Sequence, residues 1–137
     1  MPVTDEMRQL DTLRIALAIA LAGGIHAGVA THHGTAVSYD GSKEITVTGK
    51  VTEFWWHNPH SALFLDGTNE KGERVNWSIE MASPGVLTRA GWTRRTFAPG
   101  DTVSVIVNPS RAGTPSGVCD NPCKATVNGK EVAWRAP

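Results

Sequence analysis

The sequence predicts a mainly β fold: a small Greek-key barrel of the OB type, with one short helix between its third and fourth strands. Segments that alternate apolar and polar residues, rich in β-branched side chains, recur between turn sequences. A single helix signal, at residues 83–91, follows the third of these segments. A small β-sandwich would show no such helix, whereas an OB-type barrel uses one to close an end. A hydrophobic N-terminal segment precedes the barrel.

Residues 1–30 are predicted to be a signal peptide, or a signal anchor if the segment is not cleaved. The apolar run from Ile15 to Ile25 is shorter than the roughly 20 apolar residues that a membrane-spanning helix needs. Smaller, more polar residues follow it, as in secretory signals. A start at Met7 would remove two acidic residues and leave a net basic flank. We therefore expect an exported, periplasmic protein, with anchoring in the inner membrane by this segment as the alternative.

The barrel domain is predicted at residues 44–137, after an extended, polar and glycine-containing lead-in at residues 31–43. Its first strand covers residues 45–54, where apolar and polar side chains alternate. Gly49 lies in the middle of this strand and marks a bulge or a sharp coil. The sequence Trp-Trp-His-Asn-Pro-His then makes a turn into a second strand at residues 61–66.

A third strand is expected at residues 73–80, after a turn at residues 67–72 whose composition is polar and glycine-rich. Because side chains alternate between the two faces of a strand, Val75, Trp77 and Ile79 fall on one face. Those three are predicted to point into the core.

The helix that follows has recognisable ends. Ser83 is a favourable N-cap, Pro84 suits the first helical position, and Gly91 can end the helix in a left-handed conformation. A fourth strand is expected at residues 102–107, where β-branched residues again dominate.

The C-terminal part is predicted to be a loop followed by a hairpin. Residues 108–118 are rich in glycine, proline and serine and are expected to form a loop. Two short apolar segments, residues 124–127 and 131–134, flank the tight-turn sequence Asn128-Gly129. That arrangement is typical of a β-hairpin.

The two cysteines, Cys119 and Cys123, are separated by Asp-Asn-Pro. In an oxidising compartment such a pair most simply closes a small structural disulfide loop. A thiolate metal site or a redox pair is the alternative.

The charge balance disfavours nucleic acid as a partner. The chain carries 13 Lys and Arg against 13 Asp and Glu, and no basic stripe or charge run is present. The sequence also lacks an amphipathic basic helix for a membrane surface, a phosphate-cradling glycine loop and any triad-like ordering. We therefore expect a binding protein rather than an enzyme, with membrane attachment only through an uncleaved N-terminal segment.

Several short motifs occur together between residues 56 and 103. They are Trp56-x-Asn58-Pro59-His60, Trp77-x-x-Glu80, Ser83-Pro84, Leu87-x-Arg89-x-Gly91-Trp92 and Pro99-Gly100-Asp101-x-Val103. With the pair His32-His33, this combination resembles a family of small exported bacterial proteins classed as a domain of unknown function. The resemblance spans residues 32–107 and implies export and a small β-barrel, but no activity. Thr31, where members carry a small alanine-like residue, and the cysteine loop depart from the family.

Clustered histidines are the main hint of chemistry. His57 and His60 lie on the predicted loop between the first two strands, a common ligand-facing surface in OB-type barrels. Two imidazoles are too few for a tight metal site, so a third ligand would come from His32, His33 or Glu80. The metal that we expect is copper before zinc. The alternative is a structural turn in which His60 only pads the loop.

The histidine pair near the predicted cleavage site could bind metal in its own right. Cleavage after Ala30 would place His33 third from a free amine, an arrangement that chelates Cu(II) or Ni(II) through backbone nitrogens and imidazole. Adventitious copper binding by an exported terminus is the alternative.

A partner protein of the envelope or membrane is the second predicted class of ligand. The candidate docking residues are Trp55, Trp56, Arg89, Trp92, Arg94 and Arg95. Adjacent residues of a strand point to opposite faces, so one ring of the pair Trp55 and Trp56 is expected to be exposed. Arginines in such positions more often form a solvated helix face, which is the favoured interpretation of Arg89, Arg94 and Arg95.

Overall fold

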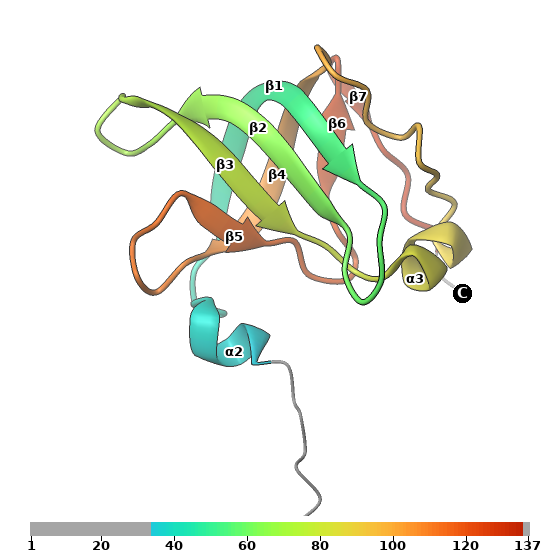
Figure 1. The fold of residues 1–137 in the computed structure, drawn as a ribbon, viewed down its shortest axis with the longest axis horizontal. Coiled ribbons are helices and arrows are strands. Elements are labelled where there is room, and N and C mark those ends of the chain that lie inside the picture. The colour runs from blue at the N-terminus through green and yellow to red at the C-terminus, as the bar shows by residue number, and fades with distance from the viewer. Residues whose placement is uncertain (1–33, 136–137) are drawn as a thin grey trace, which may run out of the picture. The chain divides into compact units, whose positions relative to one another are not determined.

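The computed structural model describes residues 34–135. The predicted signal segment, His32 and His33 lie outside these residues. The elements in chain order are α2 (Thr35–Ser38), β1 (Ile45–Trp55), β2 (Ala62–Thr68), β3 (Arg74–Glu80), α3 (Pro84–Arg89), β4 (Thr102–Pro109), β5 (Ser116–Val118), β6 (Ala125–Val127) and β7 (Lys130–Glu131). Figure 1 shows the strands wrapped around one core, with α3 at one end.

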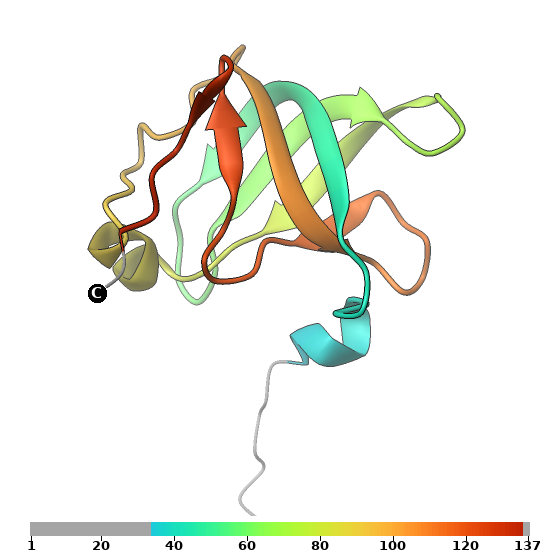
Figure 2. The same cartoon turned by 180° about the vertical axis from the view of Figure 1, so that it is seen from behind.

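The strands close into a five-stranded barrel in the order β1-β2-β3-β5-β4, with β4 pairing back to β1. All of these pairs are antiparallel except β3 with β5. Seen from behind, the hairpin of β6 and β7 continues the sheet from β4 (Figure 2). With α3 between the third and fourth strands, the predicted OB-type barrel is confirmed.

The closing strand β5 was not predicted. Residues 108–118 were expected to form a loop, but Ser116–Val118 pair with both β3 and β4. Three residues that include a glycine carry no strand periodicity, so only long-range pairing defines this element. Gly117 is required there, because an added Cβ would lie 2.7 Å from Cγ2 of Val107.

The lead-in also differs from the prediction of an extended segment. Thr35–Ser38 form one helical turn, and Tyr39 makes an isolated antiparallel bridge with Ser110. Asp40 pairs with Lys43 within the lead-in, at 3.2 Å, and joins the lead-in to the barrel through an ion pair with Arg111, at 3.7 Å. These contacts with the loop between β4 and β5 cannot be read from local sequence.

Gly49 does not form the predicted bulge. The register of β1 against β2 shifts between Val51 and Glu53 instead. Gly49 marks a place where β1 passes close to its neighbour, since an added Cβ would lie 2.5 Å from the carbonyl oxygen of Asp66. At this position β1 pairs with both β2 and β4, so glycine permits the sharp coiling that lets one strand serve both sides of the barrel.

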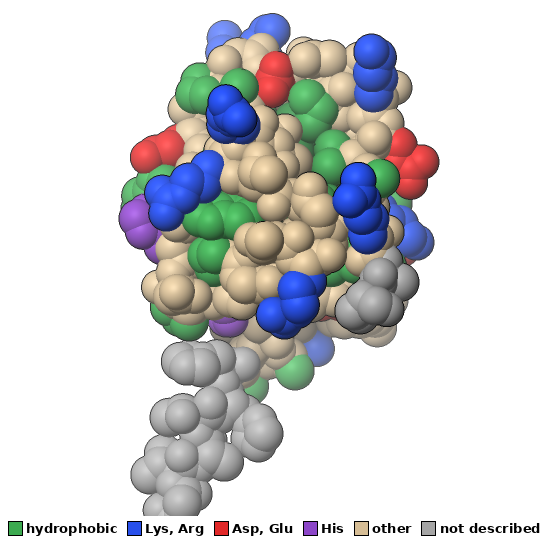
Figure 3. Space-filling model, turned by 90° about the vertical axis from the view of Figure 1, so that its right-hand side faces the viewer, with side chains coloured by type: hydrophobic (Ala, Val, Ile, Leu, Met, Phe, Trp, Pro, Cys, Tyr) green, Lys and Arg blue, Asp and Glu red, His purple; other side chains and the backbone are tan. Residues whose placement is uncertain are grey.

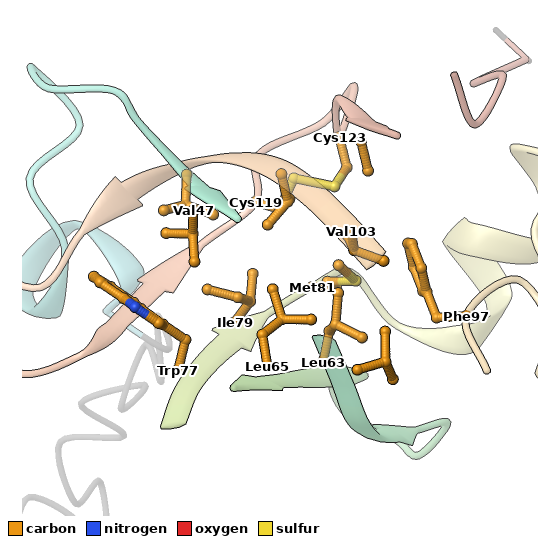
Figure 4. Packing of buried hydrophobic residues seen from close by; sticks show 14 of the residues in the cluster. Val47, Leu63, Leu65, Trp77, Ile79, Met81, Phe97, Val103, Cys119 and Cys123 are labelled. Carbon is orange, nitrogen blue, oxygen red and sulfur yellow. A yellow bond between two sulfur atoms is a disulfide. The ribbon is translucent and has the colours of Figure 1, made fainter. Parts of the chain in front are cut away.

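The core confirms the predicted faces and the helix boundaries. Trp77 and Ile79 are buried and Val75 is half-buried, and the inward side chains of several strands meet with those of the α3 region (Figure 4). Ser83 caps α3 by accepting a hydrogen bond from the Val86 amide at 3.4 Å, and Gly91 has φ +91°. No helix of residues 34–135 has the length and apolar character to cross a bilayer.

The C-terminal hairpin is present, but its second strand is shorter than predicted. Asn128 and Gly129 both have positive φ, 50° and 80°, as a tight hairpin turn requires. β7 covers only Lys130–Glu131, whereas residues 131–134 were expected. Beyond β7 the Val132 amide still donates to the carbonyl of Ala125, and the Ala133 carbonyl accepts a hydrogen bond from the Trp92 indole at 3.1 Å.

Candidate functional site

The loop between β1 and β2, residues 56–61, carries both predicted loop histidines. It starts where Trp55 ends β1 and returns to the sheet at Ala62, opposite Glu80 at the end of β3. The backbone of Ser61 exchanges hydrogen bonds with Ala82 and Met81, which fixes the loop against the chain leaving β3. The histidines therefore lie on a rigidly attached loop beside the ends of β1 and β3.

His60, Glu80 and Tyr39 make one hydrogen-bonded group, called here the His60 cluster. His60 Nδ1 pairs with Oε1 of Glu80, and the Tyr39 hydroxyl donates to Oε2 of the same carboxylate at 3.2 Å. Both partners of the ion pair are half-buried, with 36% and 27% of their side chains exposed. One carboxylate therefore links the lead-in, the first loop and β3.

Burial raises the pKa of the Tyr39 phenol, and the negative charge of Glu80 and the hydrogen bond to it raise that pKa further. The neutral phenol is thus the form that the cluster favours, as a donor to the carboxylate. Tyr39 was not predicted as a site residue, because no local sequence pattern relates it to Glu80, which lies 41 positions later.

His57 does not join this cluster. Its ring lies edge-on to Trp55, with centroids 6.3 Å apart and an interplanar angle of 88°, and its side chain is exposed. Among residues 34–135 no three His, Cys, Asp or Glu side chains are grouped so that they could hold a metal ion. Of the predicted metal ligands that lie within residues 34–135, only His60 and Glu80 are brought together.

Trp55 is the centre of an exposed aromatic surface. It is 47% exposed, and it packs against Phe64 with centroids 4.9 Å apart at an angle of 64°. We call the outward side chains of β1, β2 and β3 around it the outer aromatic face. Its members are Glu53, Trp55, Ala62, Phe64, Ser78 and Glu80.

Phe64 was missed by the sequence analysis, although a signal was present. Leu63 and Leu65 are fully buried, so the alternation of β2 turns Phe64 outward. An aromatic residue at an outward position of a half-buried strand is the signal that could have found it.

The other two predicted docking tryptophans are less accessible. Trp56 is half-buried and packs edge-on against Phe54, with centroids 5.7 Å apart, so the expectation that one ring of the pair Trp55 and Trp56 is exposed is confirmed. Trp92 is only 2% exposed. Its assignment as a docking residue is wrong, because its ring packs in the core against Phe97 and Trp134.

Arg89, Arg94 and Arg95 are exposed at the end of the barrel closed by α3. Within the described part of the chain, none of them has an ion-pair partner. Lys and Arg side chains are spread over the face that Figure 3 presents, on the α3 side of the molecule. They are separated by uncharged surface and do not converge on one point.

The sulfur atoms of Cys119 and Cys123 lie at disulfide-bond distance, with Cα atoms 5.2 Å apart. Both residues are buried, at 3% and 2% exposure, and they belong to the core cluster. The geometry supports the structural disulfide over the thiolate metal site or redox pair.

A hollow of about 530 Å³ lies near the start of β3, between residues 69–71 and the loop after β4. Val75 and Trp77 contribute to its wall. None of the residues predicted to bind metal or a partner lines it.

The comparisons with known proteins give a family but no characterised relative. The model of a family of unknown function, DUF6152, matches residues 20–120. Neither curated proteins nor solved structures gave a match.

Proposed function

This chain belongs to the DUF6152 family of unknown function, and we propose that it is an exported binding protein. Its ligand would bind at the loop between β1 and β2 and on the outer aromatic face. The observation that carries the proposal is the exposure of Trp55, 47%, on the first-loop side of the barrel. The loop between the first two strands and the face of strands two and three are where OB-type barrels take ligands.

The packing of Trp55 supports a binding role. The rings of Phe64 and His57 both lie edge-on to the Trp55 indole. These two contacts hold the indole in one orientation before a ligand binds. Leaving a large aromatic side chain in water forgoes about 2 kcal/mol of burial. A ligand that covers the ring would recover that free energy without an ordering cost for the tryptophan.

Export is supported by the N-terminal sequence and by the cysteines. The apolar segment of signal-peptide length precedes the described residues. Cys119 and Cys123 lie at disulfide distance, which is compatible with an oxidising compartment such as the bacterial periplasm.

A transition-metal ion, copper before zinc, is the second candidate ligand. It is favoured by the pairing of His60 Nδ1 with Glu80, because metal-binding imidazoles are commonly oriented by a carboxylate at the other ring nitrogen. In this alternative Glu80 positions His60 rather than binding the metal itself. His57, His32 or His33 would have to supply the remaining ligands, since one imidazole is not a site.

Docking onto a larger envelope or membrane complex is the remaining alternative. Arg89, Arg94 and Arg95 are exposed and have no ion-pair partner within residues 34–135. In that case the N-terminal segment would remain as an anchor, and Trp55 would contact a protein partner.

The proposal can be tested by NMR on 15N-labelled protein purified after its natural export. The probe is a protein-free extract of the producing cell's periplasm, with and without chelator. The expected result is a shift of the Trp55 indole N–H and of the amides in residues 56–61. In the Trp55→Ala variant the extract should no longer shift the amides of residues 56–61. Val37→Ala is the matched control, because Val37 is 80% exposed and lies on α2.

The other outcomes contradict the proposal. Shifts that centre on His60 and disappear with chelator would mean that the ligand is a metal ion bound at His60, not a ligand of the outer aromatic face. Shifts confined to Arg94 and Arg95, or none at all, would exclude ligand binding at the outer aromatic face. Mass spectrometry of the same sample would report the N-terminal residue and any bound metal.

A further inference from the structure

The register of the first three strands places an aromatic wall opposite a polar one. Trp55, Ala62 and Glu80 occupy one row across β1, β2 and β3. Because neighbouring strands are about 4.8 Å apart, the backbones of Trp55 and Glu80 are about 10 Å apart along this row. Ala62 lies between them and is too small to fill the space above the sheet.

The next row continues the same arrangement. Glu53, Phe64 and Ser78 are cross-strand neighbours. Phe64 supports the indole of Trp55, whereas Ser78 is again small. The outer aromatic face therefore carries the Trp55 ring on β1, the Phe64 ring on β2 and the Glu80 carboxylate on β3.

The polar wall is organised and can accept hydrogen bonds from a ligand. Glu80 is held by His60 and by the Tyr39 hydroxyl, which fixes the direction of its oxygens. A carboxylate has about four lone-pair sites. Glu80 can thus accept further hydrogen bonds from a ligand while it keeps its two protein partners.

The charge of the surface discriminates between ligand classes. The outward charged side chains of β1, β2 and β3 in this region are Lys50, Glu53, Asp66, Arg74 and Glu80. Carboxylates outnumber the cations, and Asp66 is further fixed by a 2.9 Å hydrogen bond from Asn76. This surface lacks an excess of cations, and nucleic-acid affinity depends on cations that neutralise phosphates, so a polyanion is disfavoured here.

We propose that the outer aromatic face binds an uncharged oligosaccharide. One sugar ring would lie against Trp55, and its hydroxyl groups would donate hydrogen bonds to Glu80. Oligonucleotides and oligosaccharides are the two ligand classes that this face of OB-type barrels takes. The exposed Trp55 ring beside a fixed carboxylate, without an excess of cations, favours the second. This inference rests on the proposed function and adds the chemical class of the ligand.

The test uses the exported protein and four defined probes, measured by isothermal titration calorimetry and NMR. Two are uncharged hexasaccharides, of β-1,4-linked glucose and of β-1,4-linked N-acetylglucosamine. The other two are a heparin-derived hexasaccharide and a thymidine hexanucleotide. At least one uncharged probe should bind and shift the Trp55 indole signal. Trp55→Ala should weaken binding at least about tenfold, as for a central aromatic anchor.

Glu80→Gln keeps the shape of the polar wall and should weaken binding less than Trp55→Ala does, whereas Val37→Ala should bind as the wild type does. Melting temperatures of the variants separate loss of fold from loss of the ligand contact. Stronger binding of either anionic probe would overturn the inference.

The experiments distinguish failure of the proposed binding function from failure of the proposed oligosaccharide class. If the periplasmic extract shifts the Trp55 indole signal but neither uncharged hexasaccharide does, the oligosaccharide class is wrong and the binding face stands. If the extract also leaves Trp55 unchanged, both proposals are overturned.

Discussion

The Tyr39 hydroxyl donates a hydrogen bond to Oε2 of Glu80, a residue 41 positions later, at 3.2 Å. The same carboxylate pairs with His60. Through this contact the segment before the barrel reaches the end of β3 and the first loop. The ligand surface that we propose therefore depends on residues from three separate parts of the chain.

Tyr39 should titrate above its ordinary pKa of 10.0. It is the chain's one tyrosine, so tyrosinate absorbance in an alkaline titration reports on it alone. Because the folded-state pKa is raised, this group contributes stability below pH 10 that is lost as the pH rises through the folded value. Glu80→Gln should lower the midpoint toward 10, since it removes a negative charge beside the phenol.

Asp66→Asn is the control for that titration, because Asp66 contacts Asn76 instead. A midpoint that does not move in Glu80→Gln would mean that the contact between Tyr39 and Glu80 is not formed in solution.

Asp40 should make stability depend on acidic pH. Its pKa is lowered from 3.8 to about 2, first by the hydrogen bond from the Ser42 hydroxyl and then by Lys43 and the Ser42 amide. The folded-state pKa is depressed, so the contribution is present above about pH 4 and is lost as the pH falls toward 2. Asp40→Asn should melt below the wild type at pH 6, and the difference should shrink between pH 4 and pH 2.

Thermal melts monitored by circular dichroism across that range check this expectation. Asp120→Asn is a matched control, because Asp120 is an exposed carboxylate without an ion-pair partner in residues 34–135. A pH-independent difference for Asp40→Asn would exclude the linkage.

Ser61→Ala should stabilise the fold. The Ser61 hydroxyl is fully buried, and within the described residues its oxygen has no hydrogen-bond partner. Burying such a group without a partner costs about 1–3 kcal/mol, so removing it should raise the free energy of unfolding by about 1 kcal/mol. Urea denaturation measures the change.

Ser104→Ala provides the contrast, because the Ser104 hydroxyl bonds to that of Thr48 at 2.8 Å on the exposed surface. That variant should be neutral or slightly less stable. A loss of stability in Ser61→Ala would reveal a partner, such as an ordered water, for the buried hydroxyl.

Breaking the link between Cys119 and Cys123 should lower the free energy of unfolding. The cysteines are four positions apart, and closing so short a loop contributes about 2 kcal/mol by the chain-entropy estimate. The double variant Cys119→Ala/Cys123→Ala should show this loss in urea denaturation. Protein that reacts with a thiol reagent in the native state, without reductant, would contradict the disulfide.

Local sequence predicted those features that local chemistry defines. Alternating side chains predicted β1 and the inward face of β3, where Trp77 is buried and Ile79 is fully buried. Ser83 and Gly91 marked the ends of the helix segment because a cap and a left-handed residue are needed at those points. The turn at Asn128 and Gly129 was predictable for the same reason.

The missed elements depend on contacts between distant residues. β5 has three residues and exists through its pairs with β3 and β4. Trp92 looked like a surface residue beside exposed arginines, yet its ring fills the end of the barrel against Phe97. The local sequence around a residue does not show which distant side chains cover it in the folded protein.

The sequence by itself determined the barrel class and the helix between its third and fourth strands, because periodicity and capping act within a few residues. It favoured a disulfide between Cys119 and Cys123, which the positions of the two sulfur atoms support. Only the tertiary structure decided which candidate side chains meet. It joined His60 to Glu80 and Tyr39, placed His57 beside Trp55, and put Trp55 in one row with Glu80. Those relationships follow from strand register and loop attachment, which are fixed by packing over the whole barrel.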